Sequence, residues 1–274
     1  MTPLLLSSRA VLRLAGPDAR DFLQGLLTND MMALTPSRPL YAGLLSAQGK
    51  ALYALLLFDG ADAGLPGEVL VDVDAGQAGA LARRLGMYKL RKAVTIALAP
   101  ELGVWVAPEG MPGRAADPRH AALGSRWLAP KLENAPEGDA VWAAHRRRLG
   151  VAEAAEIGED QILWLETGAG LLNGVSFTKG CYVGQENTAR MHHRDKLRKL
   201  ILPFAVADGE VADPQLRDGE GRVVGALRGG IEGGVALVHV RLEALDGQPL
   251  TLDGRPARLL PPPWAVSLLP EGAA

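Results

Sequence analysis

The chain has 274 residues, of which 48% are hydrophobic and 22% are charged, and its formal net charge is -2. This composition is typical of a soluble globular protein with a real core, and the length allows one or two domains, with two favoured. The charge argues against a dedicated nucleic-acid binder, because such proteins normally carry a strong basic excess, although local basic patches are compatible with it.

The N-terminal segment, residues 1–7, has no basic start and too short an apolar run for a signal peptide. No stretch approaches the roughly 18 uninterrupted apolar residues of a transmembrane helix. We therefore expect a cytoplasmic protein with no membrane contact. A reducing cytoplasm suits the single cysteine of the chain, which has no partner for an internal disulfide.

The next part of the chain predicts a layer that mixes strands and helices. Apolar or alternating runs predict strands over 10–14, 51–58, 69–73 and 94–98. A helix is expected to start at Gly16-Pro17-Asp18, and a second helix is expected over 76–85 with Gly86 as its left-handed cap. Four apolar side chains recur at one-four spacing and are predicted to pack inward: Phe22, Leu23, Leu26 and Leu27. The strand-helix-strand order favours an α+β fold over a bundle.

Residues 108–136 are rich in Gly, Pro and Ala without periodicity, which predicts a loop, and a helical pattern resumes over 141–149. From Leu200 onward, Gly-containing turn dipeptides separate short apolar runs, which indicates a small antiparallel β-domain. The ordered part is expected to end at Pro261-Pro262-Pro263.

The only cysteine, Cys181, lies in the octapeptide Lys179-Gly180-Cys181-Tyr182-Val183-Gly184-Gln185-Glu186. Lys179 is expected to favour the thiolate, and so is the dipole of a helix that begins at Gln185 and Glu186. The competing interpretation is a small, buried, inert cysteine, which is the commonest fate of a free thiol. A lone cysteine cannot hold an iron-sulfur cluster, which ordinarily takes four ligands, so any cluster chemistry must borrow ligands from elsewhere.

The octapeptide resembles the K-G-C-[FY]-x-G-Q-E signature of the YgfZ family, folate-binding relatives of the glycine-cleavage T-protein. Few eight-residue motifs are this specific. The resemblance weakens from Ile201 onward. Before that point it is carried by these further segments: Phe22 to Asp30, Gly43 with Gln48-Gly49-Lys50, Met87 to Arg91, Arg146 to Val151, Ala189 to Met191, and Arg194 to Lys199.

The resemblance implies an α+β ring of three parts around a central channel: a folate-binding core, a ferredoxin-like insert and a C-terminal antiparallel β-barrel. The core with its insert is assigned to residues 1–199 and the barrel to residues 200–265. The implied function is support of iron-sulfur cluster assembly or repair, including repair of radical enzymes that modify tRNA. The implied cofactor is tetrahydrofolate or a folate derivative. The implied partners are iron-sulfur enzymes or assembly proteins, bound transiently, and weakly bound tRNA.

Two residues are predicted to act chemically: Cys181 ligates iron or exchanges sulfur, and Lys179 stabilises its thiolate. A pterin needs paired donors and acceptors, and the anionic tail of a folate needs cations. The side chains of these types that we expect to bind folate are Asn29, Asp30, Arg146, Glu166, Tyr182, Gln185, Glu186 and Arg190. No metal site is predicted, because the adjacent His192 and His193 point roughly 100° apart on a helix.

A folate-dependent aminomethyl or one-carbon transferase is the enzyme alternative. The T-protein carries acidic residues soon after its glycine turn, whereas Gly49-Lys50 is followed here by Ala51-Leu52-Tyr53. No carboxylate stands there to assist the transfer. An assembly or repair factor is therefore favoured over an aminomethyltransferase, and whether the chain itself turns over a substrate is left open.

Two other functions stay open. A cysteine hydrolase would use Cys181 as nucleophile, with His192 or His193 as base and Glu186 or Asp195 as the orienting carboxylate, although the histidines lie roughly 15 Å along a helix from the thiol. A tRNA binder would use the basic runs 145–148 and 194–199, which are otherwise interpreted as solvated helix faces.

Overall fold

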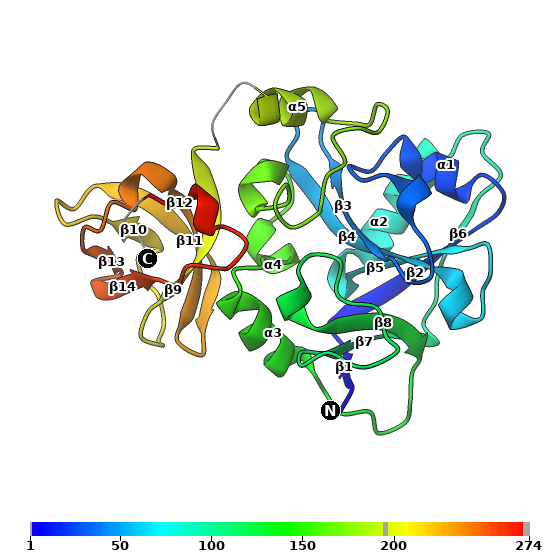
Figure 1. Ribbon diagram of the computed structural model, residues 1–274, viewed down its shortest axis with the longest axis horizontal. Coiled ribbons are helices and arrows are strands. Elements are labelled where there is room, and N and C mark those ends of the chain that lie inside the picture. Colours follow the sequence, from blue (N-terminus) through cyan, green and yellow to red (C-terminus); the bar gives the residue numbers. More distant parts are fainter. Residues whose placement is uncertain (1, 194–196, 271–274) are drawn as a thin grey trace.

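The computed structural model describes residues 2–193 and 197–270. A mixed α+β core and a closed β-barrel lie side by side, with the barrel on the left in Figure 1 and the core on the right. The sequence-based expectation of an α+β fold with a C-terminal antiparallel barrel is confirmed. The basic run 194–199 falls partly outside the described residues.

The largest sheet of the core has five antiparallel strands in the order β3-β4-β5-β2-β6. Its strands are β2 (Arg9–Ala15), β3 (Leu40–Leu45), β4 (Ala51–Asp59), β5 (Val69–Asp74) and β6 (Thr95–Leu98). Helices α1 (Ala19–Gln24) and α2 (Ala75–Tyr88) contribute to the same apolar core. The four predicted strands and the inward stripe from Phe22 to Leu27 are confirmed, the stripe residues being at most 9% exposed.

The end of α2 differs from its prediction. Gly86 does not cap the helix. The last helical residue is Tyr88, and Lys89 is the C-cap. The left-handed residue after this end is Leu90, at φ 46°. Glycine or asparagine usually takes this position, because a side chain there is crowded by the backbone.

A second sheet has three antiparallel strands, β1 (Leu4–Leu6), β7 (Leu102–Ala107) and β8 (Ser125–Pro130), in the order β1-β7-β8. Strand β8 lies within 108–136, so the prediction of a continuous loop there is wrong. The strand reads Ser-Arg-Trp-Leu-Ala-Pro, and the Arg126 side chain is nevertheless fully buried because Asp72 of β5 pairs with it. A buried charge hid the apolar pattern of the strand.

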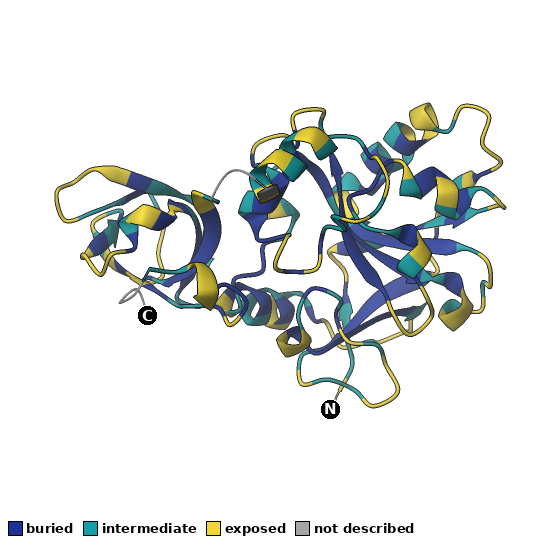
Figure 2. Cartoon of the chain, turned by 45° about the horizontal axis from the view of Figure 1, so that its top comes forward, coloured by how far each residue is buried: buried dark blue, intermediate teal, exposed yellow. Residues whose placement is uncertain are grey.

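Three helices connect the core with the barrel: α3 (Asp139–Arg148), α4 (Ala154–Ile157) and α5 (Gln185–His193). Helices α3 and α4 lie between the two parts in Figure 1, and α5 lies at the upper edge. Figure 2 shows that buried residues run through the strands of the core and of the barrel. Exposed residues gather on loops and outward helix faces, as expected for two packed bodies.

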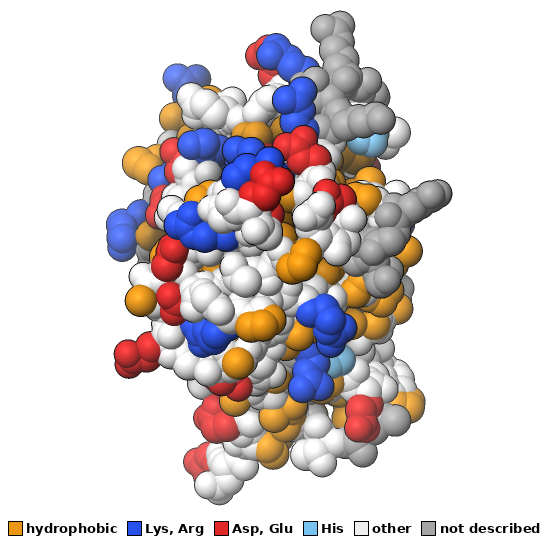
Figure 3. Space-filling model, turned by 90° about the vertical axis from the view of Figure 1, so that its left-hand side faces the viewer, with side chains coloured by type: hydrophobic (Ala, Val, Ile, Leu, Met, Phe, Trp, Pro, Cys, Tyr) orange, Lys and Arg blue, Asp and Glu red, His pale blue; other side chains and the backbone are white. Residues whose placement is uncertain are grey.

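The barrel closes through six antiparallel strands in the order β10-β11-β12-β9-β14-β13. They are β9 (Lys199–Ala205), β10 (Gln215–Arg217), β11 (Val223–Glu232), β12 (Val235–Arg241), β13 (Leu250–Leu252) and β14 (Arg255–Leu259). On the barrel end that Figure 3 draws, acidic and basic side chains of the described residues are interspersed rather than gathered by sign.

The residues after β14 pack back onto the core, so the order of the chain does not stop at Pro261-Pro262-Pro263 as predicted. Trp264 is 8% exposed, and its Nε1 donates to the carbonyl oxygen of Leu149 at 2.6 Å. A short 3-10 helix, Val266–Leu268, follows. An indole buries a large apolar area when it finds a hydrogen-bond partner, and this gain fixes the segment.

Candidate functional site

The cysteine loop, residues 179–184, leads into α5 and holds an exposed thiol next to a buried tyrosine. Cys181 is exposed, and the next residue, Tyr182, is 8% exposed and joins the apolar core. Val183 packs against the core of the five-stranded sheet. The competing interpretation of Cys181 as a buried apolar residue is therefore wrong.

Gly184 fixes the loop against the hairpin between β3 and β4. Its φ is +80°, and a Cβ at this position would lie 2.5 Å from the carbonyl oxygen of Ser46. On the hairpin side the contact is made by Gly49. A Cβ added to Gly49 would lie 3.3 Å from the carbonyl oxygen of Gly184. Asn187 of α5 donates to the carbonyl oxygen of Gln48 at 2.8 Å. Two glycines are thus required so that the two backbones can approach each other.

Lys179 ties the other end of the loop to the C-terminal end of α1. Its ammonium donates to the carbonyl oxygens of Gln24 and Leu27 at 2.6 Å and of Asn29 at 3.0 Å. It also lies 5.2 Å from the ring centre of Tyr182. Burial lowers the pKa of Lys179 to about 8. An ammonium has three donors, so none is left to hydrogen-bond the Cys181 thiolate.

A cavity of about 710 Å³ opens beside this loop. Its wall combines Tyr41 from β3 with residues 116–118 and the chain from Asn173 to Thr178. Tyr41 stacks at a tilt on Trp164, with ring centres 5.2 Å apart, so the aromatic wall is held from behind. The volume lies within the range of small-molecule pockets, about 300–1,000 Å³.

One amide and one carboxylate of the cavity wall, those of Asn29 and Asp117, already have hydrogen-bond partners. Asn29 donates to the carbonyl oxygens of Tyr41 and Asn173, both at 2.8 Å, and its own side-chain oxygen accepts from the Asp30 N–H. Asp117 binds the Arg119 guanidinium with both carboxylate oxygens, at 2.9 and 2.8 Å. These hydrogen bonds hold the wall in shape and leave Asn29 and Asp117 little capacity to bind a ligand.

Other wall groups keep capacity for a ligand. Asp30 uses Oδ1 to accept from Gln24 and from the Met32 N–H, both at 3.0 Å, which leaves Oδ2 with no hydrogen bond among the described residues. Asn173 donates through Nδ2 to the carbonyl oxygen of Pro118 at 3.0 Å, which leaves its Oδ1 as an acceptor. Arg38 brings a cation to the same wall.

The thiol and the cavity are neighbours along the chain but do not share a wall. Residues 176–178 line the cavity, and Cys181 is not among its lining residues. Phe177 of the wall stacks on His192 of α5, with ring centres 3.6 Å apart and planes 11° apart. The folate hypothesis and the thiol hypothesis therefore concern two adjacent places.

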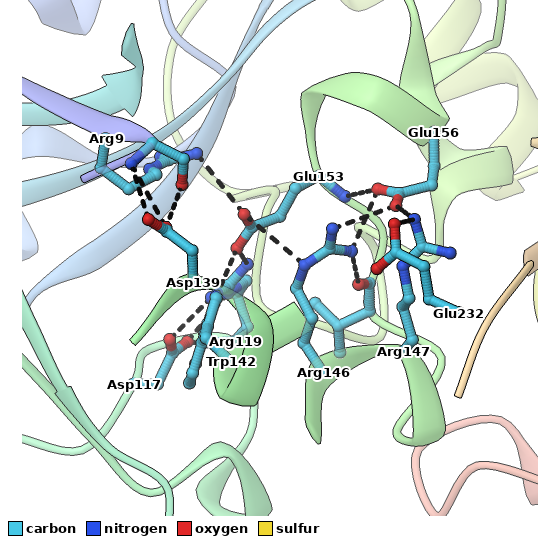
Figure 4. A network of polar contacts seen from close by, with 12 residues as sticks. Arg9, Asp117, Arg119, Asp139, Trp142, Arg146, Arg147, Glu153, Glu156 and Glu232 are labelled. Atoms are coloured by element: carbon cyan, nitrogen blue, oxygen red, sulfur yellow. Dashed lines mark hydrogen bonds and ion pairs between the residues drawn. The ribbon is translucent and has the colours of Figure 1, made fainter. Parts of the chain in front are cut away.

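Arg146 lies away from the cavity, in a buried network of ion pairs that Figure 4 shows. It binds both carboxylate oxygens of Glu156 at 3.0 Å, and its Nε lies 3.7 Å from Glu153. Glu153 also accepts from Arg119 at 2.9 Å and lies 3.6 Å from Arg9. Arg146 is 6% exposed, so it holds the core together and has no reach toward a ligand.

The network spans all the layers of the protein. Asp72 of the five-stranded sheet pairs with Arg126 of the three-stranded sheet at 2.6 Å. Arg147 of α3 lies 2.8 Å from Glu156 and 3.2 Å from Glu232 of the barrel. Burial alone would raise the pKa of Glu153, but the surrounding guanidinium groups of Arg146, Arg9 and Arg119 hold this pKa well below its ordinary value.

Glu166 lies at the seam between core and barrel. Its Oε2 is 3.1 Å from Nε2 of His239 on β12, an ion-pair distance without the direction of a hydrogen bond. Gln185 accepts from the Tyr182 N–H at 3.3 Å and so closes the turn before α5. Glu186 and Arg190 form an exposed pair at 2.8 Å on α5. Of the eight predicted folate ligands, Asn29 and Asp30 line the cavity.

Comparison with known proteins places the chain. Residues 198–267 match the family of the CAF17 C-terminal beta-barrel domain. The human mitochondrial iron-sulfur cluster assembly factor IBA57 is 34% identical over 88% of this chain and 78% of its own length. The Pyricularia oryzae IBA57 homolog is 33% identical over 93% of this chain and 75% of its own length. The chain belongs to the IBA57 family.

Membership of the IBA57 family supports a role in iron-sulfur cluster assembly, while the finer YgfZ assignment stays a resemblance. The sequence-based expectation of a cytoplasmic protein is contradicted, because the named relatives are mitochondrial and point to mitochondria. A solved structure of the glycine cleavage system aminomethyltransferase T from Bartonella henselae has the same fold. Its TM-score is 0.67 at 16% identity, over 93% of this chain and 84% of that chain.

The IBA57-family chain carries cavity residues that sequence reasoning missed: Arg38, Tyr41, Asp117 and Asn173. Asn173 gives the one local signal, since Asn173-Gly174 is a turn pair and the residue adopts φ 57°. Within 2–193 and 197–270, no three His, Cys, Asp or Glu side chains are grouped as a metal site, and no helix is long and apolar enough to cross a membrane.

Proposed function

We propose that this chain acts in iron-sulfur cluster assembly by offering Cys181 as a transient thiolate ligand to a cluster in transit. The observation that carries the proposal is the exposed thiol between anchored neighbours. Tyr182 is buried, Gly184 is seated against the hairpin, and Lys179 is bonded to three carbonyl oxygens. A loop held in this way presents its sulfur without having to unfold.

The chemistry of such a site requires a second protein. An iron-sulfur cluster ordinarily takes four ligands, and this chain supplies one thiol. The cluster is therefore cargo, shared for a time between Cys181 and thiolates of a partner that delivers or receives it. Thiolate exchange of this kind needs an accessible sulfur. By the family resemblance, the served enzymes include radical enzymes that modify tRNA.

A folate derivative fits the 710 Å³ cavity by size and by donor set. The free oxygen of Asp30 matches the amino and ring N–H donors of a pterin. Val175 and Phe177 offer apolar surface, and Arg38 offers a cation for the carboxylates of the tail. A bound reduced folate would supply a reducing pterin beside the segment that continues into the cysteine loop. We propose that Asp30 and Arg38 hold its two ends.

The buried network does not support the earlier assignment of the anionic tail to Arg146, and the exposed pair on α5 does not favour Arg190. Both guanidinium groups have carboxylate partners within 3.0 Å. The alternative function, one-carbon transfer, lacks a supporting observation, since Ala51, Leu52 and Tyr53 are buried apolar residues of β4.

The thiol proposal is tested by complementation in a host that lacks this protein. Cys181→Ser keeps the size of the side chain and removes the soft ligand, so the activity of a [4Fe–4S] reporter enzyme should fall to the level of the empty strain. Glu210→Gln, at an exposed side chain of the barrel domain, serves as the control for expression and folding. Full restoration by Cys181→Ser would remove the proposed mechanism.

The folate proposal is tested by calorimetric titration with 5-formyltetrahydrofolate. Asp30→Asn keeps an oxygen for Gln24 and Met32 but replaces the free carboxylate oxygen by a donor, so the dissociation constant should rise about tenfold or more, which is about 1.4 kcal/mol. Glu186→Gln on the exposed face of α5 should bind like the wild type. Equal affinity of both variants would separate the folate from this cavity.

A further inference from the structure

The turn after α2 carries a bulky side chain in a conformation that suits glycine. Leu90 has φ 46° and is 88% exposed, and Met87 and Tyr88 beside it are 70% and 40% exposed. A left-handed backbone with a Cβ costs free energy, and an exposed leucine returns none through burial. The stability of this chain alone therefore gives no reason for leucine at this position.

A groove of about 1040 Å³ lies between this turn and α1. Its apolar wall combines Phe22 and Leu26 with Tyr88 and Leu90. Phe22 and Leu26 are buried for the most part, at 5% and 9% exposure, whereas the turn side is open. A contiguous apolar surface of this kind on a soluble protein is typical of a site that binds another molecule.

The rim of the groove is basic. Lys89, Arg91 and Lys92 line it together with Asp21, and Asp21 pairs with Lys92. Among the described residues, no carboxylate pairs with Lys89 or Arg91. The groove thus has an apolar floor and two cations without an acidic partner, and it complements a segment with acidic and apolar side chains.

The groove and the cysteine loop share α1. Lys179 of the loop binds the carbonyl oxygens of Gln24 and Leu27 at the C-terminal end of this helix, and Phe22 and Leu26 face the groove. The six residues of α1 span roughly 9 Å at 1.5 Å per residue. Figure 1 places α1 and the segment that leads into α5 along the same upper edge of the core. A protein seated in the groove would lie next to the thiol.

We propose that this groove docks an acidic, amphipathic segment of the partner protein that shares the cluster with Cys181. The proposal rests on the proposed function in one respect, the identity of the partner as a cluster carrier. Leu90 is the apolar anchor, and Lys89 and Arg91 bind the acidic flanks of the segment. The groove holds the partner while the thiolate is exchanged, so docking and ligation are separate steps on separate residues.

The test measures the affinity of the full chain for each purified iron-sulfur carrier protein of the host in turn, by biolayer interferometry. Leu90→Asn suits the left-handed turn and so should keep or raise the melting temperature, yet it should weaken binding at least tenfold. Arg91→Glu should weaken binding similarly, and so should added salt. Leu132→Asn changes a leucine that is 64% exposed in another loop and should leave the affinity within threefold.

Cys181→Ser separates the two proposals, because it should leave the docking affinity within threefold. If it also restores reporter-enzyme activity in full, the thiol mechanism fails and the docking surface stands. Carriers that bind the Leu90→Asn and Arg91→Glu variants as tightly as the wild type overturn the docking surface. The proposal is also overturned if Leu90→Asn abolishes self-association of the chain, because the groove would then bind a second copy. It is overturned as well if Leu90→Asn abolishes binding to phosphatidylserine vesicles, because the groove would then bind a lipid surface.

Discussion

The buried ion-pair network around Glu153 and the cysteine loop both contain reactive or charged side chains, but only the loop leaves one of them accessible. In the network, Arg9, Arg119 and Arg146 converge on one carboxylate and are closed off from solvent. In the loop, the Lys179 ammonium donates all its hydrogen bonds to three carbonyl oxygens, while the nearby Cys181 thiol stays exposed.

The difference indicates which reactive side chains are available for function. A charged group whose partners all lie within the protein stabilises the fold, however suggestive its sequence context. A side chain that is exposed or lacks a partner within the protein, while the residues around it are held in place, is available to another molecule. By this criterion Cys181, the free oxygen of Asp30 and the exposed Leu90 are the functional candidates of this chain.

Glu153→Gln should have the largest effect, because it removes the shared anion from four buried guanidinium groups, those of Arg9, Arg119, Arg126 and Arg146. We expect a loss of about 3–5 kcal/mol in the free energy of unfolding, measured by urea denaturation at about pH 7. The surrounding arginines hold the pKa of Glu153 low, so the wild type has this advantage above about pH 4.3 and loses it as the pH falls through the lowered pKa.

The control for this variant is Glu232→Gln at the barrel end of the network, whose side chain is 54% exposed. It should cost at most about 1 kcal/mol, because an exposed ion pair is screened by water. Equal stability of Glu153→Gln and the wild type would mean that the network is not the structural centre described above.

Gly184→Ala should rank second. A Cβ would meet the carbonyl oxygen of Ser46 at 2.5 Å with φ at +80°, so we expect a loss of about 2–3 kcal/mol and a loosened cysteine loop. Gly180→Ala, at the residue directly before Cys181, serves as the matched control. No heavy atom lies within 4 Å of its added Cβ, so its stability should equal that of the wild type. If both variants melt alike, the loop is not seated as described.

Lys179→Met should have a smaller effect, about 1–2 kcal/mol, because three carbonyl oxygens lose their donor and water replaces it in part. Burial lowers the pKa of Lys179 to about 8, against about 10.4 in an unfolded chain. Below about pH 8 the folded protein carries the full cost of burying the Lys179 charge. As the pH rises, the folded state loses this proton before the unfolded state does, so the stability of the wild type relative to Lys179→Met should grow between about pH 7 and 9.5. Lys199→Met, an exposed lysine of β9, should show no such growth.

Local patterns predicted much of the fold and only part of the site. Four of the five strands of the large sheet follow from alternating or apolar runs, and the barrel follows from turn dipeptides, because both signals act over a few residues. Strand β3 was not predicted. Strand β8 escaped because buried Arg126 breaks its apolar pattern, and its partner Asp72 is 54 positions earlier. The cavity residues Arg38 and Asn173 escaped for the same reason: only the folded chain brings these residues, 135 positions apart, to one wall.

The central claim is that Cys181 is reachable in the native protein, and one measurement addresses it directly. Because the chain has a single cysteine, the reaction of the folded protein with Ellman's reagent reports on this sulfur alone. We predict one thiol titrated per native chain, at a rate within about tenfold of that in urea, as expected for an exposed side chain. A thiol that reacts only after denaturation would contradict the account.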